Sequence, residues 1–545
     1  MGSTVRHWGH SVRSHAWLTR TRRASGWVAG LTVALAVVVA ALAGAFSGAP
    51  GTAQKSASTQ LSLLGAVSRS NTQGGTAAPV SATHRHPNIV FVLTDDLSMN
   101  LLRYMPQVQA LQARGLTFRN YFVSDSLCCP SRSSIFTGNF PHDTGVYNNV
   151  GKDGGIRAFY AHGDEYNTFN VALQKAGYRT AMMGKYLNGY LEGPKRSPVS
   201  NRYLPPGWSR WDVAGFAYEE FKYRINQNGR IQRYGTAPRD YLTGVLARRG
   251  VSFIDSSAAR HKPFFLEVAT FAPHYPYTPA PQDAGEFPGL VAPRSPAFNV
   301  LPTDPPRWLS GHEPLTQSQT QTIDTAFRKR VQDVQAVDRL LTELEAALSK
   351  HHQLNNTYIV FSSDNGYHMG EYRLMPGKLT AFDTDIRVPL VIAGPRIPAG
   401  ATTGAMAENV DLAKTFEGIA GTSRPCDGHS LLPLFHGGIP KHWRNAVLVE
   451  HHGPASSAQD PDRQNTQSGN PTSYEAMRTP GFLYAEYRDG EREFYDLKND
   501  PYELHNLAGG LSAGQLSLLH RELVRLEDCH TGKACWAAEH VAPSA

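Results

Sequence analysis

The first 86 residues contain no aspartate or glutamate, although they carry eight lysine and arginine residues. The whole chain of 545 residues has 53 basic and 46 acidic residues and a net charge of +7. Without the first 86 residues, 45 basic residues face 46 acidic ones, so the remainder is close to neutral. The basic excess therefore belongs to the N-terminal segment, and we predict that the folded body does not bind nucleic acid.

The same N-terminal segment has the features of an export signal. Arginines precede an apolar run over residues 27–46, and about twenty residues at ~1.5 Å each can span a bilayer. Small residues at 43–45 and 47–49 offer signal-peptidase cleavage sites, and no cysteine directly follows the run, which argues against a lipoprotein. Residues 1–47 therefore predict a cleaved signal peptide or an uncleaved membrane anchor. Either way the protein is exported, and it is secreted or held on the outer face of the cell membrane.

Cysteine is scarce, with five residues in the chain. Cys529 and Cys535 enclose a short loop near the C-terminus, and a disulfide between them is the default expectation in an exported protein. Cys426 has no obvious partner in the sequence and is expected to be a buried or free thiol. The adjacent Cys128 and Cys129 cannot easily bridge each other and need another explanation.

Segments with different patterns divide the chain into domains. Residues 48–86 are rich in small and polar residues and predict a flexible linker. From residue 87 to 438, apolar strands alternate with helices, which predicts an α/β catalytic domain whose mixed, largely parallel sheet is sandwiched by helices. Shorter segments follow, and we predict a smaller α+β subdomain over residues 439–545.

The ends of the expected strands carry most of the candidate site residues. Strands are expected over residues 88–94, 178–183, 264–271, 358–363 and 388–392, and helices over 105–114, 169–175 and 325–349. In open α/β sheets, ligands bind beyond the carboxyl ends of the strands. The polar residues found there are Asp95, Asp96, Lys185, His274, Asp364 and Asn365.

Four of these residues form two pairs of neighbours in the sequence, and their side chains offer oxygen atoms as metal ligands. Asp95 and Asp96 follow the first strand, and Asp364 and Asn365 follow a later one. Carboxylate and amide oxygens suit Ca²⁺ or Mg²⁺ rather than a soft metal. Taken alone, each pair is more often a turn or a helix cap, so the metal hypothesis depends on neighbouring motifs.

The most informative stretch is Cys128-Cys129-Pro130-Ser131-Arg132, followed by Thr-Gly at 137–138. This pattern resembles the activation signature of the sulfatases, members of the alkaline phosphatase superfamily. In that family a formylglycine-generating enzyme oxidises the first cysteine to formylglycine (3-oxoalanine), whose hydrate is the nucleophile. The resemblance implies that Cys128 is the modified residue, that Cys129 is its neighbour, and that Arg132 is a charge partner beside the aldehyde.

Two lysines lie in further family-like segments. Gly177–Leu187 resembles the second sulfatase signature and implies that Lys185 is catalytic, whereas an isolated lysine is usually a solvated surface residue. Lys378 lies in a Gly-Lys-Leu-Thr segment that resembles the context of the family's second active-site lysine. Both cations would offset the negative charge of a sulfate ester.

His274 lies in the segment Pro273–Pro276, which resembles the family's Pro-His-x-Pro site. A lone histidine among aromatic residues is more often a packed core residue, but an imidazole here could hydrogen-bond a sulfate oxygen or protonate a leaving alcohol. The family also binds Ca²⁺ at this edge of its sheet. The metal ligands implied by the resemblance are Asp95, Asp96, Asp364, Asn365 and the modified Cys128.

The branch of the family is indicated by Leu187, which stands where many arylsulfatases have histidine, and by the segment 364–370. Both resemble N-acetylglucosamine-6-sulfatases and heparan endosulfatases. The resemblance implies an alkaline-phosphatase-like fold and a Ca²⁺-dependent hydrolase of a sulfated sugar or glycosaminoglycan. Three alternatives stay open: an arylsulfatase of broad specificity, a phosphonate monoester or phosphodiester hydrolase, and a glycan-binding protein without catalysis, which the retained core residues disfavour.

Overall fold

The computed structural model describes residues 86–464 and 467–542, which belong to one compact unit, Ser81–Ala545. The apolar run over 27–46 and almost all of the expected linker lie outside the described residues, so the predictions made for them stay predictions. Within the described part of the chain, no helix is both long enough and apolar enough to cross a membrane.

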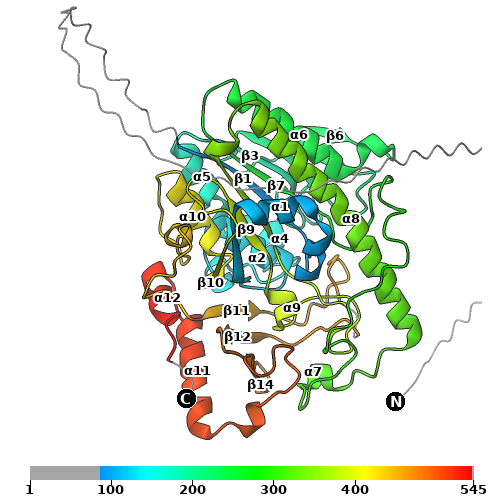
Figure 1. Cartoon of the computed structure of the whole chain (residues 1–545), viewed down its shortest axis with the longest axis vertical. Helices are drawn as coiled ribbons and strands as arrows, with labels where there is room; N and C mark the ends of the chain where they lie inside the picture. The colour runs from blue at the N-terminus through cyan, green and yellow to red at the C-terminus, as the bar shows by residue number, and fades with distance from the viewer. Residues whose placement is uncertain (1–85, 465–466, 543–545) are drawn as a thin grey trace, which may run out of the picture. The chain divides into compact units, whose positions relative to one another are not determined.

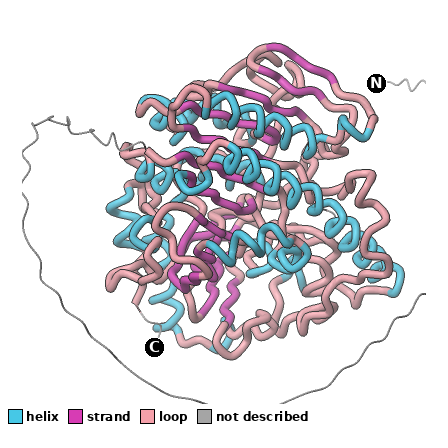
Figure 2. The backbone as a smooth tube through the Cα atoms, turned by 45° about the horizontal axis from the view of Figure 1, so that its top comes forward, coloured by secondary structure: helices cyan, strands magenta, loops and turns pink. Residues whose placement is uncertain are grey.

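A ten-stranded sheet forms the centre of the fold (Figures 1 and 2). Its strands are β1 Asn88–Thr94, β2 Leu116–Phe122, β3 Arg179–Lys185, β4 Arg210–Gly215, β5 Arg224–Gln227, β6 Arg230–Arg233, β7 Phe264–Ala269, β8 Thr357–Ser363, β9 Leu390–Ala393 and β10 Ala401–Glu408. Their order is β10-β2-β9-β8-β1-β7-β3-β4-β5-β6. The central strands β8, β1, β7, β3 and β4 are parallel, whereas β9 is antiparallel to both of its neighbours.

Helices cover both faces of this sheet, because its central strands carry apolar side chains on both faces. One layer consists of α1 Pro106–Arg114, α6 Leu242–Ala258 and α8 Gln317–Lys350. It packs on the face that carries Val90 and Val92, and Figure 1 shows α8 lying alongside α6. The other layer consists of α2 Cys128–Thr137, α4 Gly155–His162, α5 Phe169–Lys175 and α10 Asp411–Ile419. It packs on the face that carries Ile89 and Phe91.

A second, smaller sheet follows in the C-terminal part. It contains the antiparallel strands β11 Val447–His451, β12 Tyr474–Arg478, β13 Phe482–Tyr487 and β14 Arg492–Asp496. The remaining helices are α3 Pro141–Thr144, α7 Arg307–Ser310, α9 Asp383–Ile386, α11 Ala513–Glu527 and α12 Gly532–Ala538. One face of the small sheet packs on α11 through Leu448 and Met477, and Figure 1 shows α11 and α12 in red beside it. The other face adds Val449 and Leu483 to the core that contains α2 and α10.

The expected fold class, a mixed and largely parallel sheet between helices with a smaller C-terminal subdomain, is confirmed. Strand β1 and helix α5 coincide with the expected ranges, whereas α8 begins at Gln317 rather than at 325. It begins earlier because the side chains of Thr316 and Gln319 form a capping box. A disulfide joins Cys529 to Cys535, and Cys426 is buried without a disulfide partner. The expected boundaries between domains stay predictions.

Candidate active site

The polar residues expected after the strands meet at one edge of the large sheet. Asp95 and Asp96 follow β1, Lys185 ends β3, His274 follows β7 and Asp364 follows β8. Because β8, β1, β7 and β3 are parallel neighbours, their carboxyl ends lie side by side. None of these five side chains is more than 3% exposed.

Cys128 opens helix α2, and its sulfur lies among these groups. Its Sγ is 3.2 Å from Asp95 Oδ1 and 3.5 Å from Asn365 Oδ1. The Nζ atoms of Lys185 and Lys378 lie 3.3 Å and 3.0 Å from the same sulfur. Burial raises the pKa of the Cys128 thiol well above its usual range, and nearby carboxylates add to this effect. The sulfur is thus a protonated thiol at the point where two lysines and two oxygen ligands converge.

Arg132 lies one turn after Cys128 on α2 and fixes the base of the site. Its Nε donates to Asp364 Oδ2 at 2.8 Å, and its Nη1 donates to the Lys185 carbonyl oxygen at 3.1 Å. Burial alone would raise the pKa of the Asp364 carboxyl, but Arg132, Lys185 and Lys378 lower it to about 2. Asp364 is therefore a fixed negative charge.

The oxygen atoms at this edge fit a hard cation. Ligand atoms of Asp95, Asp96, Cys128 and His274 lie within 4.8 Å of one another. Asn365 is part of the same set, since its Nδ2 donates to Asp96 Oδ1 at 2.7 Å and its Oδ1 faces Cys128. Burial raises the pKa of the Asp95 carboxyl even though Lys185 opposes this effect, so the buried negative charge is incompletely compensated. A divalent cation with a preference for oxygen would compensate it.

Each of the two lysines donates to one of the two aspartates that follow β1. Lys185 Nζ donates to Asp95 Oδ2 at 2.5 Å, and Lys378 Nζ donates to Asp96 Oδ1 at 2.6 Å. Burial alone would lower the pKa of both lysines, but the carboxylates around them raise it well above the usual range. Both side chains are therefore held as cations that face Cys128.

A residue that the sequence did not indicate reaches the site from the segment between β11 and β12. Asp462 Oδ1 lies 2.5 Å from His274 Nε2 and 3.0 Å from Lys378 Nζ. Its Oδ2 accepts from Asn149 Nδ2 at 2.6 Å. Asp462 does not come directly after a strand and belongs to no recognised motif. The only local signal is the Asp-Pro-Asp sequence at 460–462, which is typical of a turn.

A tyrosine missed by the sequence analysis forms one wall. The ring of Tyr218 lies 5.0 Å from Lys185 Nζ and 4.4 Å from the His274 ring, measured to the ring centres. Its hydroxyl donates to Asn188 Oδ1 at 3.4 Å. Tyr218 lies in the connection that follows β4, so it too reaches the carboxyl edge of the sheet.

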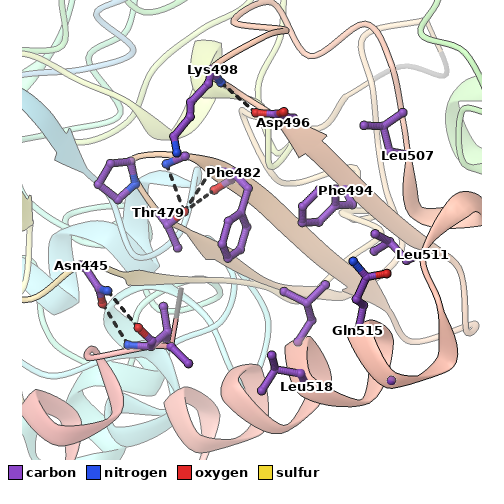
Figure 3. Close-up of a pocket in the computed structure, with 16 residues that line it drawn as sticks. Asn445, Thr479, Phe482, Phe494, Asp496, Lys498, Leu507, Leu511, Gln515 and Leu518 are labelled. Carbon is purple, nitrogen blue, oxygen red and sulfur yellow. Dashed lines mark hydrogen bonds between the residues drawn. The ribbon is translucent and has the colours of Figure 1, made fainter. Parts of the chain in front are cut away.

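A large cavity lies elsewhere, in the C-terminal subdomain (Figure 3). It has a volume of 690 Å³ and lies between the small sheet and α11, with Phe482 and Phe494 stacked at a ring distance of 5.4 Å. Figure 3 shows Leu518 on α11 and Leu511 in the connection that precedes this helix. None of the residues around Cys128 lines it. Although this cavity is large, it is therefore not the candidate active site.

Comparisons with known proteins find two family models and several relatives that match most of the chain. The Sulfatase family model matches residues 87–422, and the model described as N-sulphoglucosamine sulphohydrolase, C-terminal, matches residues 370–528. N-acetylglucosamine-6-sulfatase from Homo sapiens is 36% identical over 84% of this chain and 87% of its own. The Capra hircus protein of the same name is 35% identical, with coverages of 83% and 85%.

A solved structure supports the fold. A protein in complex with its substrate D-glucosamine-2-N,6-O-disulfate superposes with a TM-score of 0.64. It is 23% identical in sequence, and the match covers 84% of this chain and 98% of that one.

Proposed function

Because this chain belongs to the sulfatase family of sulfuric ester hydrolases, we propose that it releases sulfate from a sulfated sugar or glycosaminoglycan, with 6-sulfated N-acetylglucosamine as the preferred unit. One observation carries the proposal: Cys128 Sγ lies within 3.3 Å of both Lys185 Nζ and Lys378 Nζ, beside buried carboxylates. The names of the relatives support the choice of sugar.

The proposed nucleophile is made from Cys128. A formylglycine-generating enzyme would convert this residue to formylglycine, whose hydrate supplies one hydroxyl that attacks sulfur and a second that later expels sulfate. The first turn of α2 supports this proposal, because it holds residue 128 between the lysines and the acidic pairs. An unmodified, fully buried thiol with a raised pKa is a weak nucleophile.

The chain's own cations would bind and orient the ester. A sulfate monoester carries negative charge, so Lys185 and Lys378 can stabilise the charge on its equatorial oxygens during transfer. His274 directs Nε2 toward the same space, while its Nδ1 faces the Tyr275 carbonyl oxygen at 2.7 Å and donates to it. Nε2 is therefore the nitrogen that would protonate the leaving alcohol.

The proposed metal is Ca²⁺, with Mg²⁺ as the alternative. Asp95, Asp96, Asp364 and Asn365 would hold it, and the ion would neutralise charge beside the sulfate. Arg132 would keep Asp364 oriented through its 2.8 Å contact.

We also propose that the protein acts outside the cytoplasm, secreted or anchored by residues 27–46. Two features support export: the apolar run after several arginines and the Cys529–Cys535 disulfide, which suits an oxidising compartment.

The experiment compares esters under one assay. The full chain, produced together with a formylglycine-generating enzyme, is incubated with N-acetylglucosamine 6-sulfate, a 6-sulfated oligosaccharide, 4-nitrophenyl sulfate and a phosphodiester, and anion release is measured. We expect the 6-sulfated sugars to be hydrolysed fastest and Cys128→Ala to release none. Faster hydrolysis of the phosphodiester would assign the chain to the other activity considered from its sequence. Sulfate release by Cys128→Ala would place the nucleophile elsewhere.

A further inference from the structure

Asp462 brings a negative charge to a site that must receive a negatively charged ester. Its Oδ1 contacts both His274 Nε2, at 2.5 Å, and Lys378 Nζ, at 3.0 Å. Those are two of the groups through which the proposed function binds and protonates the substrate. A sulfate oxygen placed between the same two donors would make the same contacts.

Asp462 Oδ1 lies close to Cys128, the residue that reacts in the proposed function. Lys378 Nζ lies 3.0 Å from Cys128 Sγ and equally far from Asp462 Oδ1, so a single ammonium group connects the two. Asp462 is only 4% exposed, and two carboxylate or sulfate oxygens cannot occupy one point between the same donors. The carboxylate and a sulfate oxygen placed between these donors would therefore exclude each other.

Defined contacts hold the carboxylate there. Asn149 Nδ2 donates to Asp462 Oδ2 at 2.6 Å and to Asp460 Oδ1 at 3.1 Å, and Asn149 Oδ1 accepts from the backbone of Cys129 at 2.9 Å. The Asp462 backbone also donates to Asp460 Oδ1 at 2.9 Å. These bonds connect the segment to the start of α2. They make Asp462 a built part of the site.

We propose that Asp462 is a specificity-determining residue, whose carboxylate occupies the sulfate-binding position of the free enzyme and is displaced by esters with a large sugar part. The inference rests on the proposed sulfate-ester hydrolysis. Contacts to the sugar supply the free energy that moves the carboxylate away, whereas a free anion or a small aryl sulfate has no such contacts. The residue thus selects against small anions by competing with them.

The test measures binding of inorganic sulfate and does not require turnover. Sulfate affinity is determined by calorimetry for the full-length wild type, Asp462→Asn, Asp462→Glu and Asp489→Asn. Asp489 lies in the same subdomain and pairs with Arg307 at 3.2 Å, so it is the matched control. We expect Asp462→Asn to bind sulfate about tenfold more tightly or better, since a close like charge is removed, and Asp489→Asn to match the wild type. Asp462→Glu keeps the charge and should stay near the wild type.

A second readout and a second variant keep the test decisive if Asp462→Asn is less stable than the wild type. Added sulfate should raise its melting temperature more than that of the wild type, because a ligand stabilises the state that binds it. Asn149→Ala removes two bonds from the Asp460–Asp462 segment and should also tighten sulfate binding, by a smaller factor.

The outcomes separate this inference from the proposed function. Equal or weaker sulfate binding by both Asp462→Asn and Asn149→Ala would overturn the inference, while sulfate release by the wild type would leave the proposed function intact. Tighter binding in a protein that hydrolyses no sulfate ester would uphold the competition and reject the proposed function. In an active enzyme, Asp462→Asn should also raise kcat/KM for 4-nitrophenyl sulfate relative to a sulfated sugar.

Discussion

Three of the buried ion pairs around Cys128 each join a different cation to a different carboxylate: Lys185 to Asp95, Lys378 to Asp96 and Arg132 to Asp364. Removing one partner of a buried pair leaves the other charge uncompensated, which is more costly than losing an exposed pair. In the proposed reaction these side chains would therefore affect both the chemistry and the stability of the site. For a variant at any of these residues, both the activity and the stability should be measured.

Lys185→Ala should lower kcat for sulfate release by about 10²–10³-fold, because a preorganised cation beside the proposed nucleophile is lost. Steady-state kinetics with a 6-sulfated sugar would measure this, and a melting curve would show whether the protein remains folded. Lys152→Ala is the control, since that side chain is 88% exposed. Near-normal turnover of folded Lys185→Ala would remove Lys185 from the proposed reaction.

The residues of this site differ in how visible they are in the sequence. Asp95, Lys185 and Asp364 follow apolar runs of strand length, and Cys128 belongs to a specific motif, so the sequence indicated all four. Asp462 and Tyr218 reach the site through connections without regular periodicity. Their positions depend on long-range packing, which a local pattern cannot predict.

At the scale of elements, the end of β3 is held unusually close to β7. Gly184 precedes Lys185 and has φ +96°, and a Cβ atom at this position would lie 1.8 Å from the Ala269 carbonyl oxygen. Only glycine fits, because the backbone conformation and the neighbouring strand both exclude a side chain. The close approach of β3 to β7 therefore fixes the backbone position of Lys185.

Gly184→Ala should destabilise the protein by about 2–4 kcal/mol and lower sulfate release, because β3 must shift away from β7. Urea unfolding and kinetics on the same preparation would test this. Gly177→Ala is a matched control, since Gly177 also has a positive φ, +92°, but has open space around its Cβ position. A similar loss of stability in both variants would mean that backbone conformation alone, and not the contact with Ala269, explains the effect.

The elements themselves were largely predictable. Continuous apolar runs predicted β1, β7 and β8, since strands buried on both faces carry no polar alternation. The direction of β9 was not predictable, because an apolar run carries no information about which neighbour a strand pairs with. Its antiparallel pairing with β2 and β8 depends on the connections around it.

At the scale of the whole molecule, His142 connects the large domain to the C-terminal part. It lies in α3, its Nδ1 is 3.0 Å from Glu450 Oε1, and its Nε2 donates to the Cys529 carbonyl oxygen at 2.7 Å. Burial alone would lower the pKa of His142, but Glu450 raises it to about 9. The protonated imidazole therefore stabilises the folded state.

This contribution should be fully present below about pH 6.5 and lost as the pH rises through about 9, because the folded-state pKa lies above the unfolded one. We expect the free energy of unfolding of the wild type to fall by about 1–3 kcal/mol more than that of His142→Gln across this interval. Urea titrations at several pH values would measure it. His505→Gln, at an exposed position, should follow the wild type, and parallel curves for the wild type and His142→Gln would contradict the prediction.

The small sheet shares a core with α2 and α10, and the segment that follows β11 supplies Asp462 to the site. A fragment that stops before residue 447 would contain every residue of the sulfatase signatures and yet lack one side of the candidate active site. In the course of evolution, exchanges within residues 452–464 could therefore change which ester is accepted, while the groups proposed to break the sulfur–oxygen bond stay the same.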